Sequence, residues 1–72
     1  MGLSMAKRFS PEYLRSARNQ AGYTQKEAAE ALNVSYQTYQ YWENGKQPPR
    51  TDKLLKILEL FNKRLKDLVE EE

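Results

Sequence analysis

The 72-residue sequence contains no cysteine and no histidine, and it has no apolar run of the roughly 20 residues that span a membrane. Without cysteine the chain has no disulfide framework and no thiolate metal site. Without histidine it also lacks the usual general base and a common ligand of transition metals. The acidic residues are scattered rather than paired. We therefore expect no enzyme, no metal site and no cofactor.

The chain is also short, so one domain is the upper limit. A domain of this size buries only about 60% of the surface of its unfolded chain, which leaves a thin margin of stability. A compact helical fold, or help from a partner, is the expected route to stability. With no signal-peptide pattern, the sequence predicts a soluble, cytoplasmic protein.

The net charge of +2 hides an uneven distribution. Residues 1–50 carry seven basic and four acidic side chains, whereas residues 51–72 carry five basic and six acidic ones and end in three glutamates. A mildly basic body fits a nucleic-acid partner, although ordinary solubilising surface charge is the simpler explanation. Charge alone therefore does not assign a function.

Helix-starting and helix-ending residues are easy to find in the first half of the chain. Ser10 can cap a helix that opens with Pro11, and Gly22 can end it in the left-handed conformation. Thr24 and Glu27 have the spacing of a capping box, in which each residue's side chain accepts from the other's backbone N–H. We expect a first helix over residues 11–21 and a second that begins at the capping box.

The next boundaries follow the same logic. Asn33 is suited to end the second helix, and Ser35 can cap a third helix over Tyr36–Glu43. Two prolines then enforce an extended connector, and Thr51 is expected to cap a fourth, leucine-rich helix. Because no stretch alternates with a period of two, the sequence predicts an all-α protein. The short connector over residues 33–35 is typical of a helix-turn-helix.

The third helix has two chemically different faces. One contains Val34, Thr38, Tyr39 and Trp42, and the other contains Tyr36, Gln37, Gln40, Tyr41 and Asn44. The second face is rich in amides and hydroxyls, which can pair with base edges in the major groove of DNA. A solvated polar face above a small core is the alternative explanation of the same pattern.

The motifs in this region resemble those of the phage-repressor and Cro-like (XRE-type) helix-turn-helix proteins. The resemblance covers about residues 14–69, and it is strongest where Thr24-Gln25 opens the second helix and Trp42-Glu43-Asn44-Gly45-Lys46 closes the third. It implies a compact five-helix, lambda-repressor-like DNA-binding domain whose third helix enters the major groove.

The same resemblance implies roles for individual residues. The expected base-reading residues are Tyr36, Gln37, Gln40 and Tyr41, and the expected phosphate-binding residues are Thr24, Gln25, Asn44 and Lys46. Arg18 and Glu43 correspond to an ion pair that ties the first helix to the third. Three residues depart from the family pattern. Ala28 stands where many members have a larger apolar residue, Asn33 replaces the commoner glycine, and Tyr39 occupies a position that is usually aliphatic, so its hydroxyl needs a partner or a route to the surface.

Leucines and a phenylalanine recur at heptad spacing near the C-terminus, at Leu54, Leu58, Phe61, Leu65 and Leu68. The family expects a break near Asn62 and then a short fifth helix, whereas one continuous helix is the alternative. We favour the break. Core packing is the ordinary explanation of the seam, and a dimer interface is the other.

These observations divide the chain into a flexible segment at residues 1–9, a DNA-binding domain at 10–69 and an acidic tail at 70–72. Residues 1–4 precede a second methionine and are a candidate cloning remnant. The leading hypothesis is a sequence-specific regulator of transcription, a repressor that binds double-stranded DNA as a homodimer. The alternative is a protein-interaction module, such as an antitoxin or anti-repressor, whose leucine seam binds a partner.

Overall fold

The computed structural model describes residues 7–71, which form four α-helices, one short 3-10 helix and two strands. The predicted helical class is confirmed. In chain order the elements are β1 (Lys7–Phe9), α1 (Pro11–Ala21), α2 (Gln25–Ala31), α3 (Tyr36–Glu43), α4 (Thr51–Phe61), η1 (Leu65–Asp67) and β2 (Val69–Glu71).

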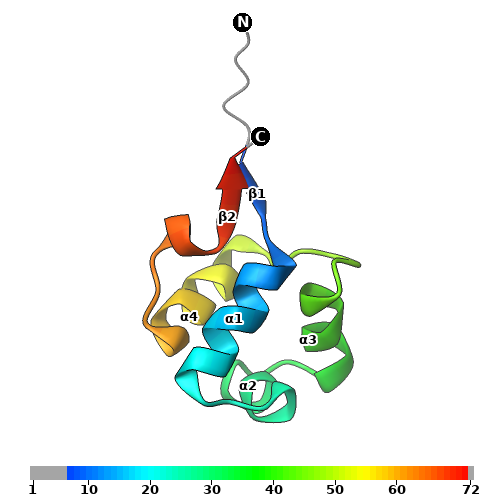
Figure 1. Ribbon diagram of the computed structural model, residues 1–72. Helices are drawn as coiled ribbons and strands as arrows, with labels where there is room; N and C mark the ends of the chain where they lie inside the picture. Colours follow the sequence, from blue (N-terminus) through cyan, green and yellow to red (C-terminus); the bar gives the residue numbers. More distant parts are fainter. Residues whose placement is uncertain (1–6, 72) are drawn as a thin grey trace, which may run out of the picture.

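Helix α1 runs through the middle of the molecule, with α3 on one side and α4 on the other (Figure 1). Helix α2 closes one end of this arrangement, and the two strands lie at the opposite end. The core between the helices consists of the buried side chains of Leu14, Ala17, Ala28, Ala29, Leu32, Tyr39, Trp42, Ile57, Phe61 and Leu68. Each of the four α-helices contributes to this core, so each of them has a buried face.

Three of the four α-helices begin directly after the predicted capping residues. The Ser10 hydroxyl accepts a hydrogen bond from the Tyr13 N–H at 3.2 Å, and the capping box of Thr24 and Glu27 is complete. The Ser35 hydroxyl caps α3 in the same way. The prediction for the fourth helix is wrong in detail, because Thr51 is already its first helical residue and no side chain caps that end.

The α2–α3 turn follows the logic of a helix-turn-helix. Asn33 adopts the left-handed conformation with φ of 59°, which glycine adopts more readily and asparagine tolerates. Ala28 and Ala29 are almost fully buried in α2, and α2 packs against α3. Small side chains at these buried positions leave room for α3 to pack against α2.

The predicted break in the C-terminal region is confirmed. Helix α4 ends at Phe61, and Asn62 is left-handed with φ of 56°. The predicted fifth helix is only one 3-10 turn, in which the Arg64 N–H donates to Asp67 Oδ2 at 2.9 Å. The turn is short because Val69, two residues beyond Asp67, already belongs to strand β2.

Strands β1 and β2 form an antiparallel pair that the sequence did not predict. Their register joins Lys7 to Glu71, Arg8 to Glu70 and Phe9 to Val69. The Ser10 N–H also donates to the Leu68 carbonyl at 2.7 Å, which ties the base of the pair to the core.

The two strands include residues that the sequence predicts to lie in the terminal segments. The segment 1–9 contains β1 from Lys7 onward, and the acidic tail 70–72 begins inside β2. The candidate cloning remnant at residues 1–4 lies outside the described residues.

The leucine seam does not form one continuous stripe, because its helix ends at Phe61. Phe61 and Leu68 are buried in the core, and Leu54 and Leu58 pack partly buried against it. Leu65 alone of the five is exposed, at 51%. Four members of the seam therefore belong mainly to the domain's own core.

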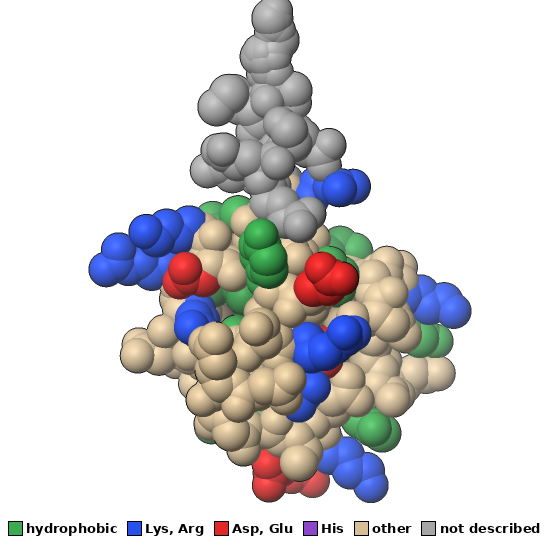
Figure 2. All heavy atoms as spheres, in the orientation of Figure 1, with side chains coloured by type: hydrophobic (Ala, Val, Ile, Leu, Met, Phe, Trp, Pro, Cys, Tyr) green, Lys and Arg blue, Asp and Glu red, His purple; other side chains and the backbone are tan. Residues whose placement is uncertain are grey.

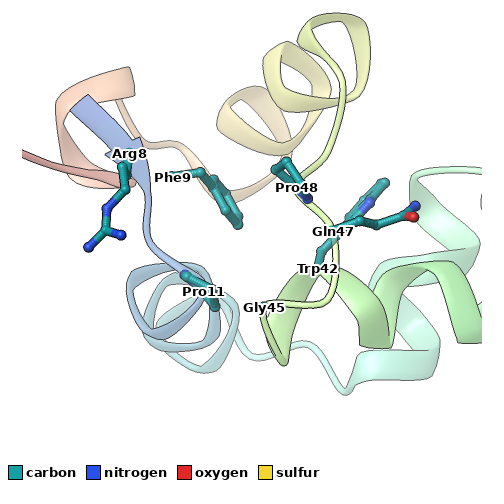
Figure 3. A pocket seen from close by; sticks show the side chains of 7 residues that line it. All are labelled: Arg8, Phe9, Pro11, Trp42, Gly45, Gln47 and Pro48. Carbon is teal, nitrogen blue, oxygen red and sulfur yellow. The ribbon is translucent and has the colours of Figure 1, made fainter. Parts of the chain in front are cut away.

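A surface hollow of about 430 Å³ lies between β1 and the loop that follows α3 (Figure 3). Phe9, Pro11 and Pro48 contribute apolar side chains to its lining, together with Trp42. Because Trp42 belongs to the buried face of α3, this hollow lies behind that helix rather than on its exposed face.

Candidate nucleic-acid interface

Helix α3 presents the polar face that the sequence predicts to be outermost. Tyr36 is 41% exposed, and Gln37 is also exposed. Gln40 and Tyr41 are partly exposed. The opposite face of α3 is closed against the core by Tyr39, Trp42 and Glu43. The four predicted base-reading residues thus lie together on the accessible side of one helix.

The predicted phosphate-binding residues lie at the two ends of the α2–α3 unit. At the start of α2, the Thr24 hydroxyl accepts from the Glu27 N–H at 3.0 Å, and Glu27 Oε1 accepts from the Thr24 N–H at 2.9 Å. Gln25 is partly buried, and its Nε2 donates to Glu43 Oε1 at 2.9 Å. One amide hydrogen of Gln25 is therefore committed to the protein, and the other remains for a ligand.

At the other end, Asn44 and Lys46 follow the last turn of α3. Asn44 Oδ1 accepts from the Lys46 N–H at 3.1 Å, which orders the turn at Gly45. The Lys46 ammonium lies 5.4 Å from the centre of the Tyr41 ring. Both Asn44 and Lys46 are exposed, so their side chains are available to an anionic partner.

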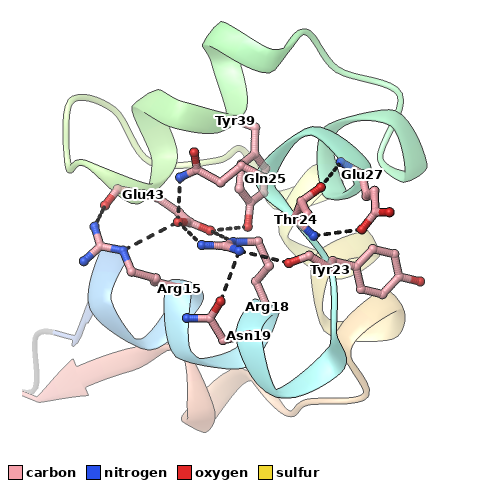
Figure 4. A network of polar contacts seen from close by, with 9 residues as sticks. All are labelled: Arg15, Arg18, Asn19, Tyr23, Thr24, Gln25, Glu27, Tyr39 and Glu43. Atoms are coloured by element: carbon pink, nitrogen blue, oxygen red, sulfur yellow. Dashed lines mark hydrogen bonds and ion pairs between the residues drawn. The ribbon is translucent and has the colours of Figure 1, made fainter.

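Glu43 is the centre of a buried polar network that joins three helices (Figure 4). Its Oε2 accepts from Arg18 Nε at 2.7 Å and from the Tyr39 hydroxyl at 2.6 Å. Its Oε1 accepts from Arg18 Nη2 at 3.2 Å and from Gln25 Nε2 at 2.9 Å. Tyr39, which departs from the family pattern, therefore finds its hydroxyl partner one helical turn away. The ion pair of Arg18 and Glu43 is present and almost fully buried at Glu43.

The network sets the charges of its members. Burial by itself would raise the pKa of Glu43, but hydrogen bonds from Arg18, Tyr39 and Gln25 outweigh burial and hold the pKa below its usual value. The hydrogen bond to Glu43 raises the pKa of Arg18. Burial and the neighbouring Glu43 raise the pKa of the Tyr39 phenol. At neutral pH, Glu43 is therefore ionised and Tyr39 keeps its proton.

Two basic residues near this region were missed by the sequence reasoning. Arg15 Nη2 donates to the backbone carbonyl of Glu43 at 3.0 Å, so a side chain from α1 satisfies a carbonyl at the end of α3. Lys26 lies with its ammonium 5.8 Å from the centre of the Tyr36 ring. The three-residue spacing of Arg15 and Arg18 could have placed Arg15 on the same face of α1. No comparable signal marked Lys26.

Charge is spread rather than concentrated on the molecule. Figure 2 shows Lys and Arg side chains both at the rim and within one face, with acidic side chains among them. In the described part of the chain, no three acidic side chains cluster in a way that could hold a metal ion. None of the helices within residues 7–71 is long and apolar enough to cross a membrane.

The chain belongs to the XRE-type, Cro-like family of helix-turn-helix proteins. Residues 14–68 match the family described as "Helix-turn-helix". The chain is also 49% identical over 49 residues to the HTH-type transcriptional regulator ImmR of Bacillus subtilis (strain 168). That match covers 68% of this chain and 39% of the relative, so the chain spans well under half the length of this curated protein.

Proposed function

We propose that this protein is a sequence-specific double-stranded DNA-binding regulator of transcription that acts as a repressor. The observation that carries the proposal is the exposed, uncharged polar face of α3 within a helix-turn-helix. The similarity to a protein named as a transcriptional regulator supports it. In this proposal α3 lies in the major groove and α2 crosses above it, the docking mode of related phage repressors.

The base-reading step uses the chemistry of amides and phenols. Gln37 and Gln40 can each present a donor and an acceptor to the edge of an adenine. Tyr36 and Tyr41 offer a hydroxyl and an apolar ring edge that suits a thymine methyl. Contacts of this kind depend on the identity of the base pair, whereas contacts to phosphate do not.

The phosphate-binding step fixes the register of this helix on the duplex. We assign it to Thr24 and Gln25 on one side of α3 and to Asn44 and Lys46 on the other. The uncommitted Nε2 hydrogen of Gln25 is a donor of fixed orientation, since Glu43 can accept only from the nitrogen end of the amide. Lys46 supplies the charge, and its contact releases counterions.

Binding as a homodimer to two half-sites about 34 Å apart follows from the small size of the domain. The alternative, a partner-binding module that uses the leucine seam, has less support. Phe61 and Leu68 are buried within the domain and would be available to a partner only after unfolding of the C-terminal region.

The test begins with selection of binding sites from random duplex DNA. Affinities for the selected duplex and for a random duplex are then measured for the wild type and for Gln37→Ala and Tyr41→Ala. Each substitution is expected to reduce the difference between the two duplexes by about 1–3 kcal/mol. Equal losses on both duplexes would contradict base reading by these residues.

Lys46→Ala separates the phosphate contact from base reading. We expect it to weaken binding to both duplexes alike. It should also reduce the slope of log K against log salt by about the contribution of one phosphate contact. The exposed Lys56 provides a matched control, because Lys56→Ala removes the same charge from helix α4, outside the proposed interface. An unchanged salt slope in Lys46→Ala would remove Lys46 from the interface.

A further inference from the structure

Two lysines lie over the rings of two tyrosines on the exposed face of α3. The Lys26 ammonium is 5.8 Å from the centre of the Tyr36 ring, and the Lys46 ammonium is 5.4 Å from that of Tyr41. Both distances are within the range of cation–π attraction. The two rings are predicted base readers, so each pair joins a cation to a side chain that would contact a base.

The pair of Lys26 and Tyr36 bridges two helices. Lys26 is the second residue of α2, and Tyr36 is the first residue of α3. A helical side chain normally leans over the preceding turn of its own helix, which limits its orientation. Tyr36 has no preceding turn of α3 to lean on, and its side chain is 41% exposed. The orientation of its ring therefore depends on a neighbour from another element.

We propose that Lys26 is a positioning residue that holds the Tyr36 ring in the orientation in which it reads a base. The proposal rests on the proposed function and adds a residue to it. The ammonium attracts the face of the ring and leaves the ring edge and hydroxyl for the base pair. Orientation before DNA arrives lowers the cost of ordering the side chain on binding.

The two lysine–tyrosine pairs lie at a spacing along α3 that can be compared with the spacing of base pairs. Tyr36 and Tyr41 are five residues apart in one helix, which is about 7.5 Å along its axis. That length corresponds to about two base-pair steps of 3.4 Å. Oriented rings at both ends of this interval define which base pairs the amides of Gln37 and Gln40 can reach between them.

The experiment compares Lys26→Gln, Lys26→Arg and the control Lys56→Gln, which removes the same charge from an exposed position on α4. Tyr36→Ala first identifies the base pair at which Tyr36 discriminates. In Lys26→Gln, discrimination at this base pair is expected to fall about two- to five-fold, the fold-change of an exposed cation–π contact. Lys26→Arg should keep the discrimination, and Lys26→Gln should add no loss in a Tyr36→Ala background.

The free protein provides an independent readout. Protons on the Lys26 ε-carbon should show an upfield NMR ring-current shift that Tyr36→Leu abolishes, because the methylene group then no longer lies over an aromatic ring. Absence of that shift in the wild type would overturn the pairing, whatever the DNA measurements show.

The DNA measurements distinguish the two proposals. If Lys26→Gln only weakens binding to all duplexes, or only lowers the salt slope, Lys26 is a phosphate contact and the inference is wrong. If the wild type prefers a selected duplex and Lys26→Gln discriminates between duplexes as well as the wild type, the inference fails and the proposed function stands. A wild type without any preference among duplexes overturns the proposed function and this inference together.

Discussion

Replacing Tyr39 with phenylalanine tests how much one hydrogen bond of the buried network contributes to the stability of the domain. The Tyr39 side chain is fully buried, and its hydroxyl donates to Glu43 Oε2 at 2.6 Å. Phenylalanine keeps the ring, and hence the edge-on contact with Trp42 at a centroid distance of 5.6 Å. The substitution therefore removes a donor without opening a large cavity.

The expected loss follows from the partners that remain. A hydrogen bond to a charged group contributes about 1.5–3 kcal/mol. Glu43 Oε2 still accepts from Arg18 Nε at 2.7 Å, so the carboxylate is not left without a partner. We therefore expect the lower end, a loss of about 1.5 kcal/mol. For a domain of this size, such a loss lowers the melting temperature by about 6–12 °C.

Thermal unfolding followed by circular dichroism measures this difference, and urea unfolding gives the free energy directly. Tyr13→Phe is the matched control, since Tyr13 is 43% exposed and loses the same hydroxyl from α1. We expect the control to melt like the wild type. If Tyr39→Phe melts together with Tyr13→Phe, the hydrogen bond to Glu43 adds nothing to stability and the reasoning from the network is refuted.

Two further predictions concern the network and the C-terminal break. The pKa of Glu43 is held below its usual value, so its contribution to stability is present above the unfolded value of about 4.3 and is lost as the pH falls through the lower, folded value. Urea midpoints should therefore decline in acid, and a decline of equal size in Arg18→Met would show that the pair is not its source. At Asn62, with φ of 56°, alanine should destabilise the domain by about 1 kcal/mol while glycine costs little. Equal urea midpoints for the two variants would argue against the left-handed conformation.

The helices were predictable because their boundaries depend on local chemistry. The hydroxyls of Ser10, Thr24 and Ser35 each accept from a backbone N–H three residues later, so the signal lies within one turn. The left-handed Asn62 is similarly local. Thr51 misled the assignment because it has the residue type of a cap, whereas Arg50 takes the capping position in extended conformation and no side chain caps that end.

The strand pair was not predictable from the sequence pattern. Each strand has three residues, which is too short to establish an alternation of period two. Their pairing joins Phe9 to Val69 at opposite ends of the chain, and only the tertiary fold brings these residues together. The same pairing limits the predicted fifth helix to a single turn, because the residues after Asp67 are needed as a strand.

Helical phase predicted correctly which side chains of α3 are exposed and which are buried. It separates the exposed Gln37 from the buried Trp42, which lies about 140° further around the helix and outside the arc of the polar face. It could not show that Gln25 donates to Glu43 or that Lys26 lies over Tyr36, since both contacts cross from α2 to α3. The roles of these residues toward DNA remain predictions from the family resemblance and the geometry.

The buried acid at the end of α3 explains how so small a core can fix the direction of that helix. Apolar contacts are non-directional, so they fix the rotation of a helix about its axis less sharply than directed hydrogen bonds do. Glu43 instead receives four directed hydrogen bonds, from Arg18 on α1, from Gln25 on α2 and from Tyr39 on its own helix. A rotation of α3 by one residue, about 100°, would break the bonds from α1 and α2 together and leave the charge of Glu43 with only its bond from Tyr39. The residue that ties the three helices together therefore also reinforces the rotation of α3 in which Tyr36 and Gln37 face outward.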